Sequence, residues 1–200
     1  RGERLGHAYL LDKLNFEKGD IVLDCGANTG DLMIYFENLG LDVNYYGFEP
    51  GLMEFKCLEL NVLKGSLFNY ALGDNDTTMD FYYKPEFGDS SLVEMEDFET
   101  KYTVSVKKLS TLMDELQLAK KPIKVMKIEA EGFEPEIIRG LDGRFNNIQY
   151  ITADLGPERG KEQESTIAEV LNYLLVRDFE ISHVNVLRHS FLLKNKAFKI

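Results

Sequence analysis

The alternation of strand-like and helix-like segments constrains the fold of this chain more than any other feature of its sequence. Apolar runs rich in β-branched and aromatic residues predict strands at residues 21–25, 42–49, 66–72, 123–128 and 148–154. Apolar residues at helical spacing predict helices around 32–39, 52–62, 110–116, 135–141 and 167–174. Such alternation is typical of right-handed βαβ units, so we predict an α/β fold with a mainly parallel sheet covered on both faces.

Two regions depart from this alternation. Near the end of the chain, strand-like runs at 179–184 and 190–193 follow each other with only a turn between them, which predicts an antiparallel hairpin at one edge of the sheet. In the middle, strands are predicted around 78–83 and 103–106, separated by a long surface loop over 84–101. Because 200 residues suit one hydrophobic core, we predict a single domain over 1–200, with 1–19 as a lead-in.

The segment VLDCGANTGDLMIYF, residues 22–36, joins a strand to a helix through a turn that contains Gly26, Asn28 and Gly30. Glycine and asparagine tolerate positive φ angles, and ligands of open α/β sheets bind where such turns lie, at the carboxyl ends of the strands. A dinucleotide fingerprint, G-x-G-x-x-G, would need glycine in place of Asn28 and Asp31, and Asp31 would repel a pyrophosphate. The turn therefore favours a ligand without phosphates, although a purely structural turn would carry the same glycines.

Glu49 follows the second predicted strand, 25 residues after Asp24. An acid at this position of a nucleotide-binding α/β fold accepts hydrogen bonds from ribose hydroxyls. S-adenosylmethionine has a ribose and no phosphate, so it satisfies both Glu49 and the glycine-containing turn. The alternative is a solvated glutamate before Pro50.

These segments resemble the FkbM-type S-adenosylmethionine-dependent methyltransferases. The resemblance rests on VLDCGANTG (22–30), YGFEP (46–50), NYALGD (69–74), Ser90 with Ser91, and KIEAEGFEPEIIRG (127–140), in this order. The pattern K-I-x-x-E-G-x-E is its most specific part. The family usually has Asp where this chain has Glu129, so the carboxylate here extends one methylene further.

The resemblance implies a class I methyltransferase fold, which is Rossmann-like and has a seven-stranded, mostly parallel sheet with an antiparallel terminal strand. It also implies S-adenosyl-L-methionine as cofactor and methyl transfer to oxygen, on a hydroxyl of a saccharide or small metabolite. The cofactor-binding residues that it implies are Asp24, Gly26, Ala27, Asn28, Gly30, Glu49, Pro50, Asn69, Ala71 and Leu72.

Three carboxylates at later strand ends are the candidate catalytic residues. Glu129 and Glu131 lie two residues apart after the strand at 123–128, and Asp154 ends the next strand. Neighbouring carboxylates can raise the pKa of one member, which then serves as a general base for a hydroxyl, or they can bind the hydroxyls of a sugar. We favour Glu131 for a functional role. For Glu129, a buried structural ion pair with Lys127 is an equal alternative.

Composition limits the partners. The chain has 23 Lys and Arg against 34 Asp and Glu, a net charge of −11, which disfavours nucleic acid. Cys25 and Cys57 lack metal-ligand spacing, so no metal site or disulfide framework is predicted, and two free thiols suit a cytoplasmic protein. With no apolar run of membrane-spanning length and no signal peptide, we expect no membrane partner.

Two other functions remain open at this point. A nicotinamide-dependent oxidoreductase would share Glu49 and the alternating fold, but Asn28 and Asp31 disfavour it. A non-catalytic cofactor-binding or interaction module would keep Glu49 and the glycines without needing Glu131.

Overall fold

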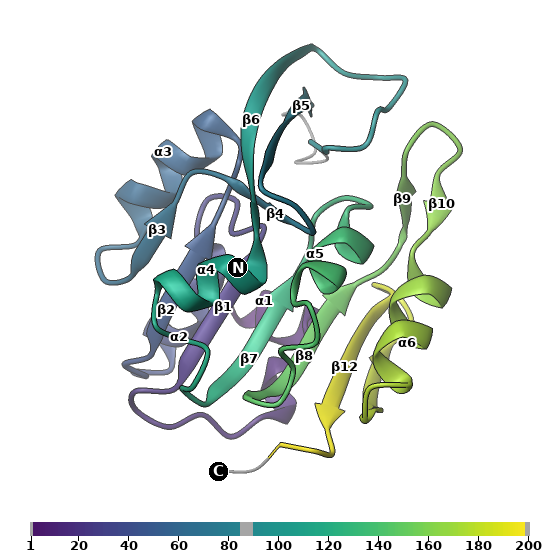
Figure 1. Ribbon diagram of the computed structural model, residues 1–200. Helices are drawn as coiled ribbons and strands as arrows, with labels where there is room; N and C mark the ends of the chain where they lie inside the picture. Colours follow the sequence, from purple (N-terminus) through teal and green to yellow (C-terminus); the bar gives the residue numbers. More distant parts are fainter. Residues whose placement is uncertain (1, 85–89, 199–200) are drawn as a thin grey trace.

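A seven-stranded sheet forms the centre of the computed structural model, which describes residues 2–84 and 90–198 (Figure 1). In spatial order its strands are β11 (Phe179–Asn185), β12 (Ser190–Asn195), β8 (Ile148–Asp154), β7 (Ile123–Ile128), β1 (Ile21–Cys25), β2 (Asn44–Phe48) and β3 (Ser66–Phe68). The strands from β8 to β3 are parallel to one another, whereas β12 is antiparallel to both β8 and β11. The predicted parallel sheet and terminal antiparallel hairpin are therefore confirmed.

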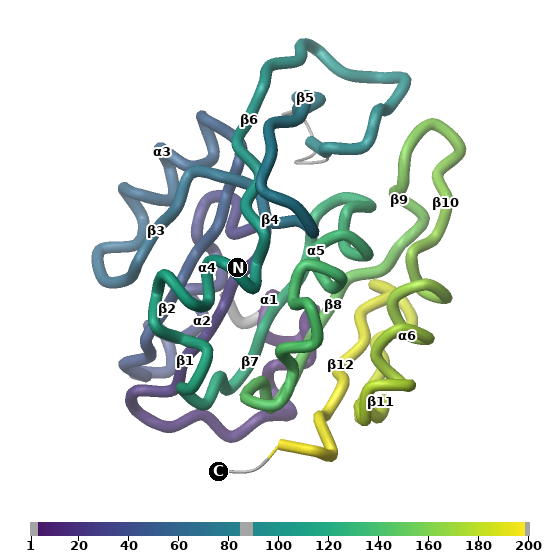
Figure 2. Tube along the Cα trace, viewed as in Figure 1, coloured from purple at the N-terminus to yellow at the C-terminus, as the bar shows by residue number. Residues whose placement is uncertain are grey.

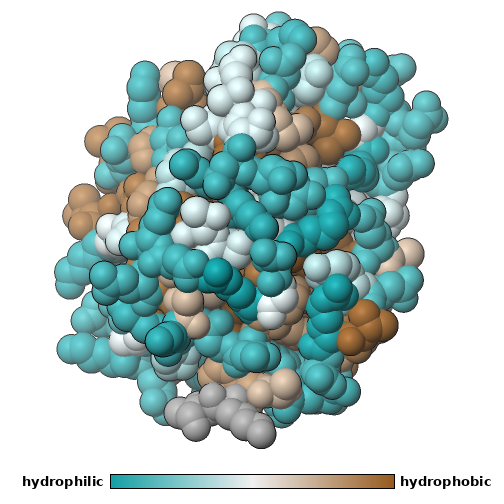
Figure 3. Space-filling model, viewed as in Figure 1, coloured by the Kyte–Doolittle hydropathy of each residue, from teal (hydrophilic) through white to brown (hydrophobic). Residues whose placement is uncertain are grey.

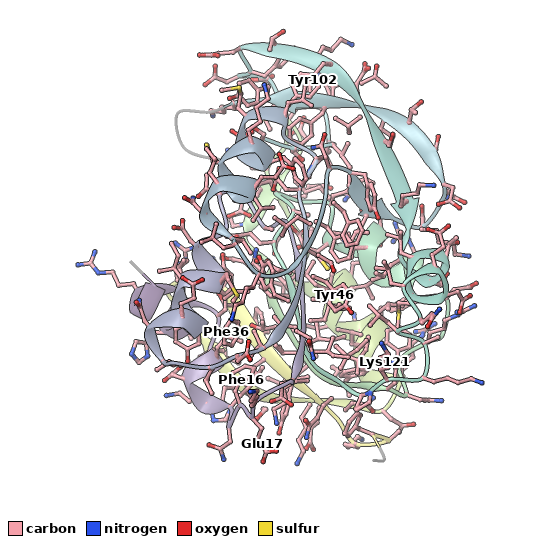
Figure 4. The ribbon with its side chains drawn as sticks, turned by 90° about the vertical axis from the view of Figure 1, so that its left-hand side faces the viewer. Phe16, Glu17, Phe36, Tyr46, Tyr102 and Lys121 are labelled. Atoms are coloured by element: carbon pink, nitrogen blue, oxygen red, sulfur yellow. The ribbon has the colours of Figure 1, made fainter. Side chains whose placement is uncertain are left out.

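Helices cover both faces of this sheet, as predicted. They are α1 (Gly2–Ala8), α2 (Asp31–Asn38), α3 (Leu52–Asn61), α4 (Leu109–Glu115), α5 (Glu134–Gly140) and α6 (Ile167–Leu175), with a short 3-10 helix at Leu11–Lys13. Apolar residues of α4, α5 and α6 form one core cluster with the sheet, and those of α1, α2 and α3 form a second on the other face. The second cluster includes an edge-on contact between Phe16 and Phe36, whose ring centroids are 4.9 Å apart (Figure 4).

The predicted strand at 66–72 is wrong in its length, because the chain breaks it after Phe68. There the side-chain amide of Asn69 donates hydrogen bonds to the backbone carbonyls of Glu49 and Pro50, and the chain leaves the main sheet. It continues in a separate three-stranded sheet of β4 (Ala71–Gly73), β6 (Thr100–Lys108) and β5 (Thr77–Tyr83). The strands predicted near 78–83 and 103–106 are present, but they belong to this small sheet.

Two structures rise above the carboxyl ends of the parallel strands (Figures 1 and 2). One is the small sheet with the connection that follows it, and the other is a hairpin of β9 (Pro157–Arg159) and β10 (Glu164–Ser165) that the sequence did not predict. The predicted surface loop is shorter than expected, because β6 already begins at Thr100 and Ser91 forms a β-bridge with Tyr82. Residues 85–89 of this loop lie outside the described part of the chain.

The face of the molecule seen in Figure 3 is mainly hydrophilic, in line with the net charge of −11. Hydrophobic side chains gather on its left, in the region of α3 and β3, where Leu60 and Leu63 are exposed. Across residues 2–84 and 90–198, no helix has the length and hydrophobicity of a transmembrane segment.

Candidate active site

A cavity of about 340 Å³ opens at the carboxyl ends of the parallel strands, beneath the small sheet. This volume is within the range of small-molecule binding sites. Its lining includes the turn after β1, the end of β2, the first residues of β4 and the loop after β7: Asp24, Gly26, Ala27, Asn28, Glu49, Pro50, Ala71, Leu72, Lys127, Glu129 and Glu131. Most of the residues predicted from sequence to bind a cofactor or to act in catalysis therefore meet in one place.

The turn after β1 has the left-handed backbone expected from its glycines and asparagine. The φ angles of Gly26, Asn28 and Gly30 are 84°, 47° and 88°. A Cβ atom on Gly26 would lie 1.8 Å from the carbonyl oxygen of Glu129, so only glycine allows the turn to approach the loop after β7. Gly30 does not line the cavity, and a Cβ atom there would instead collide with Leu58 and Val62 at and after α3.

Glu49 ties the glycine turn to the start of α3. Its Oε2 accepts a hydrogen bond of 2.8 Å from the Asn28 amide, and its Oε1 accepts one of 2.7 Å from the Gly51 amide. Burial raises the pKa of this carboxyl group to about 7, although the two amides act in the opposite direction. Asn69 lies outside the cavity lining and supports Glu49 through its backbone carbonyl.

Lys127 is buried at the centre of the site, where its ammonium group joins several elements. Its Nζ lies 3.0 Å from Asp24 Oδ1 and 3.2 Å from Glu129 Oε2, and it donates a 2.6 Å hydrogen bond to the Gly26 carbonyl. Burial alone would lower the pKa of Lys127, but the two carboxylates outweigh it and hold the pKa well above its usual value. The predicted ion pair between Glu129 and Lys127 is thus present, and Glu129 still lines the cavity.

Glu129 and Asp154, two of the candidate catalytic carboxylates, differ in protonation. Burial alone would raise the pKa of Glu129, but Lys127 and a hydrogen bond from Tyr9 lower it overall. Burial and the charge of Glu129 raise the pKa of Asp154 to about 6. Asp154 does not line the cavity, but it lies 3.5 Å from Arg188, which does. Glu129 is therefore ionised at neutral pH, whereas its raised pKa brings the titration of Asp154 nearer to the range where a general base works best.

The loop that carries Glu131 is held by its own motif. The buried carboxylate of Glu134 accepts hydrogen bonds from the amides of Ala130 and Gly132, and the Ser91 hydroxyl donates to the Glu131 carbonyl. Glu131 has a positive φ of 48° and hydrogen-bonds Glu158 of β9. Burial and the charge of Asp154 raise the pKa of Glu158 to about 7. The K-I-x-x-E-G-x-E pattern thus contains residues that line the cavity, among them Glu131, and also Glu134, which holds their loop in place.

Several lining residues were missed from the sequence. Leu5 and Tyr9 come from the predicted lead-in, Arg188 from the turn between β11 and β12, and Glu54 from the first turn of α3. No local pattern marks Leu5, Tyr9 and Arg188, because each reaches the cavity only through the folding of a distant segment. Glu54 lies close to Glu49 in the sequence, but its position on α3 did not mark it as a site residue. Glu131 was predicted because it follows a recognisable strand end, whereas Lys127 was named only as an ion-pair partner of Glu129.

Most of the sequence matches a known protein family. The model of the methyltransferase FkbM domain matches residues 24–181. A protein of Beauveria bassiana (strain ARSEF 2860) named Methyltransferase 1 is 22% identical over 174 residues, which cover 74% of this chain and 70% of that protein.

Solved structures show the same fold at low sequence identity. The methyltransferase FkbM of Methylobacillus flagellatus KT aligns with a TM-score of 0.60 and 14% identity, and it covers 90% of this chain. This chain spans only 44% of that protein. TrmK of M. capricolum, in complex with S-adenosyl-homocysteine, aligns with a TM-score of 0.52 and 10% identity over 98% of this chain and 69% of TrmK.

Proposed function

Because the chain belongs to the FkbM methyltransferase family, we propose that it transfers a methyl group from S-adenosyl-L-methionine to a hydroxyl oxygen of a saccharide or small metabolite. The observation that carries this proposal is the single cavity in which the glycine turn, Glu49 and Glu129 meet. The solved structure of TrmK with S-adenosyl-homocysteine supports the choice of cofactor through a shared fold.

The residues at one end of the cavity fit this cofactor. The ribose carries hydroxyl donors, and the carboxylate of Glu49 can still accept from the ribose, because each oxygen keeps a free lone pair after accepting a backbone amide. Pro50, Ala71 and Leu72 supply apolar surface for the adenine. Asp31 begins α2 beside this end, which disfavours the pyrophosphate of a dinucleotide. When bound, S-adenosyl-L-methionine supplies a methyl group on a positively charged sulfur that is already activated for transfer.

In the proposed reaction, the residues of this chain align the acceptor and remove the proton from its hydroxyl group. In this proposal the ionised Glu129, which lines the cavity, accepts a hydrogen bond from the acceptor hydroxyl and so orients it. An alkyl hydroxyl is a poor nucleophile at neutral pH and benefits from a general base. We assign this role to Glu131, which lines the cavity, with Asp154 as the second candidate because of its pKa near 6.

Titration calorimetry with S-adenosylhomocysteine and, separately, with NAD tests the cofactor. We expect binding of S-adenosylhomocysteine only, and no binding at millimolar concentration would overturn the proposal. A library of hydroxylated acceptors, screened by mass spectrometry for the gain of a methyl group, tests the reaction. Glu131→Gln should abolish methyl gain while cofactor affinity is kept, which separates an enzyme from a non-catalytic binding module.

A further inference from the structure

Two carboxylates converge on one small gap at the start of α3. A Cβ atom built on Gly51 would lie 2.4 Å from Oε2 of Glu54 and 2.9 Å from Oε1 of Glu49. Both glutamates line the cavity described above. The absence of a side chain at Gly51 is therefore what allows the two acids to come together.

One oxygen of the Glu54 carboxylate lacks a hydrogen-bond partner in the part of the chain that the structure describes. Its Oε2 is buried, yet it has no hydrogen-bond partner within residues 2–84 and 90–198. Glu54 is the third residue of α3, the position from which an acidic side chain commonly accepts the amide of the residue that caps the helix. That amide belongs to Gly51 and already donates to Glu49, so this partner is taken.

Leaving a buried carboxylate oxygen without a partner costs free energy unless another molecule supplies a donor. The neighbouring groups do not meet this need. Tyr83 contacts the Glu54 carboxyl group without satisfying Oε2, and the Tyr102 hydroxyl lies against the amide of Leu52 near α3 (Figure 4). Because Glu54 lines the cavity, an occupant of the cavity is a candidate source of this donor.

We propose that Glu49 and Glu54 divide the two ribose hydroxyls of the cofactor between them, with one hydroxyl on each carboxylate. This inference rests on the proposed cofactor and adds a second binding residue to it. Each oxygen of Glu49 already accepts one backbone amide, whereas Oε2 of Glu54 accepts none, so Glu54 gains more from a new donor. A ligand that lacks one hydroxyl of the vicinal diol would leave one of the two acids without its ribose partner.

Binding of S-adenosylhomocysteine and of its 2′-deoxy and 3′-deoxy analogues, measured by calorimetry, tests this division without any turnover. In the wild-type protein both analogues should bind more weakly than the parent compound. Glu54→Ala should weaken binding of the parent about ten-fold or more, as expected for a hydrogen bond to a charged group. In this variant, the analogue that lacks the hydroxyl bound by Glu54 should bind as tightly as the parent compound. The other analogue should still bind more weakly than the parent, by the same factor as in the wild-type protein.

Glu59→Ala is the matched control, because Glu59 is an exposed acid on the same helix, and it should leave all three affinities unchanged. If Glu54→Ala fails to fold, as judged by circular dichroism, Glu54→Gln is used instead, because it keeps the side-chain volume. In this variant, the difference in affinity between the parent compound and the analogue that lacks the hydroxyl bound by Glu54 should become smaller. The inference would be overturned if, in the Glu54 variants, both analogues still bound more weakly than the parent compound by the same factors as in the wild type. By contrast, a wild-type protein that binds none of the three compounds would refute the proposed function itself.

Discussion

The Nζ atom of Lys127 lies 3.0 Å from Oδ1 of Asp24, and this ion pair joins the ends of the neighbouring parallel strands β7 and β1 beneath the cavity. The same ammonium group contacts Glu129 and the carbonyl of Gly26. On its other side, Asp24 accepts a 2.5 Å hydrogen bond from the Tyr45 hydroxyl. One buried cation therefore positions both the glycine turn, which we propose binds the cofactor, and Glu129, which we propose orients the acceptor.

Lys127→Met tests this relationship. The substitution removes the charge and leaves the buried Asp24 without its cation, so we expect the free energy of unfolding to fall by about 3 kcal/mol or more. Affinity for S-adenosylhomocysteine should fall as well. Lys124→Met, three residues earlier in β7 and away from the cavity, is the control for urea unfolding and calorimetry. Equal effects of the two substitutions would contradict the role of Lys127.

Gly26→Ala should disrupt the turn after β1. A Cβ atom there would lie 1.8 Å from the Glu129 carbonyl oxygen and would also strain a φ of 84°. We expect a loss of about 3 kcal/mol in stability, measured by urea unfolding. Gly143→Ala separates the two causes, because Gly143 has a similar φ of 81° but nothing within 4 Å of its Cβ position. It should cost only about 1 kcal/mol.

Gly140→Ala should destabilise the protein although glycine is a poor helix former. In an exposed helix the same change adds about 1 kcal/mol of stability. Here a Cβ atom would lie 1.9 Å from the Gly73 carbonyl oxygen, so α5 would have to move away from β4. We expect a net loss of about 1–3 kcal/mol in thermal or urea unfolding. A stabilised variant would mean that α5 and the small sheet do not pack this closely.

The pKa of Glu49 predicts how cofactor affinity depends on pH. Because burial raises this pKa to about 7, the carboxyl group of the free protein is partly protonated at neutral pH. Ribose hydroxyls donate better to the ionised form, so affinity for S-adenosylhomocysteine should rise between about pH 6 and about pH 8. Calorimetry in buffers of different ionisation enthalpy should detect the released proton. The Glu49→Gln variant should bind S-adenosylhomocysteine more weakly and without this pH dependence. If its affinity still rose with pH as in the wild type, the proton would come from another group.

Asp154 predicts a pH-dependent stability. Its pKa is raised to about 6, so the group stabilises the fold only while it is protonated, and this contribution is lost as the pH rises from about 4 to about 6. Asp154→Asn should therefore match the wild type near pH 4 and exceed its stability by about 1–3 kcal/mol above pH 6. Urea unfolding across this range measures the difference. A variant that is less stable at about pH 8 would show that the ionised Asp154 is stabilised by Arg188.

Local sequence patterns were sufficient for the central strands of the main sheet. The runs at 21–25, 123–128 and 148–154 are mainly apolar, and the structure buries most of their residues between two layers of helices. The turn with Gly26 and Asn28 was also predictable, because few residues other than glycine and asparagine accept its backbone angles. These features depend on interactions between residues that are close in the sequence.

The break after Phe68, the small sheet and the composition of the cavity were decided only by tertiary structure. Asn69 ends its strand because its side chain meets the carbonyls of Glu49 and Pro50, about twenty residues earlier in the chain. Tyr9 and Arg188 enter the same cavity from opposite ends of the sequence, and Glu54 acquires its position from Gly51 and Glu49. Hydrophobic periodicity reports which residues become buried, but the pairing of distant polar groups depends on strand order and on close contacts that no local pattern records.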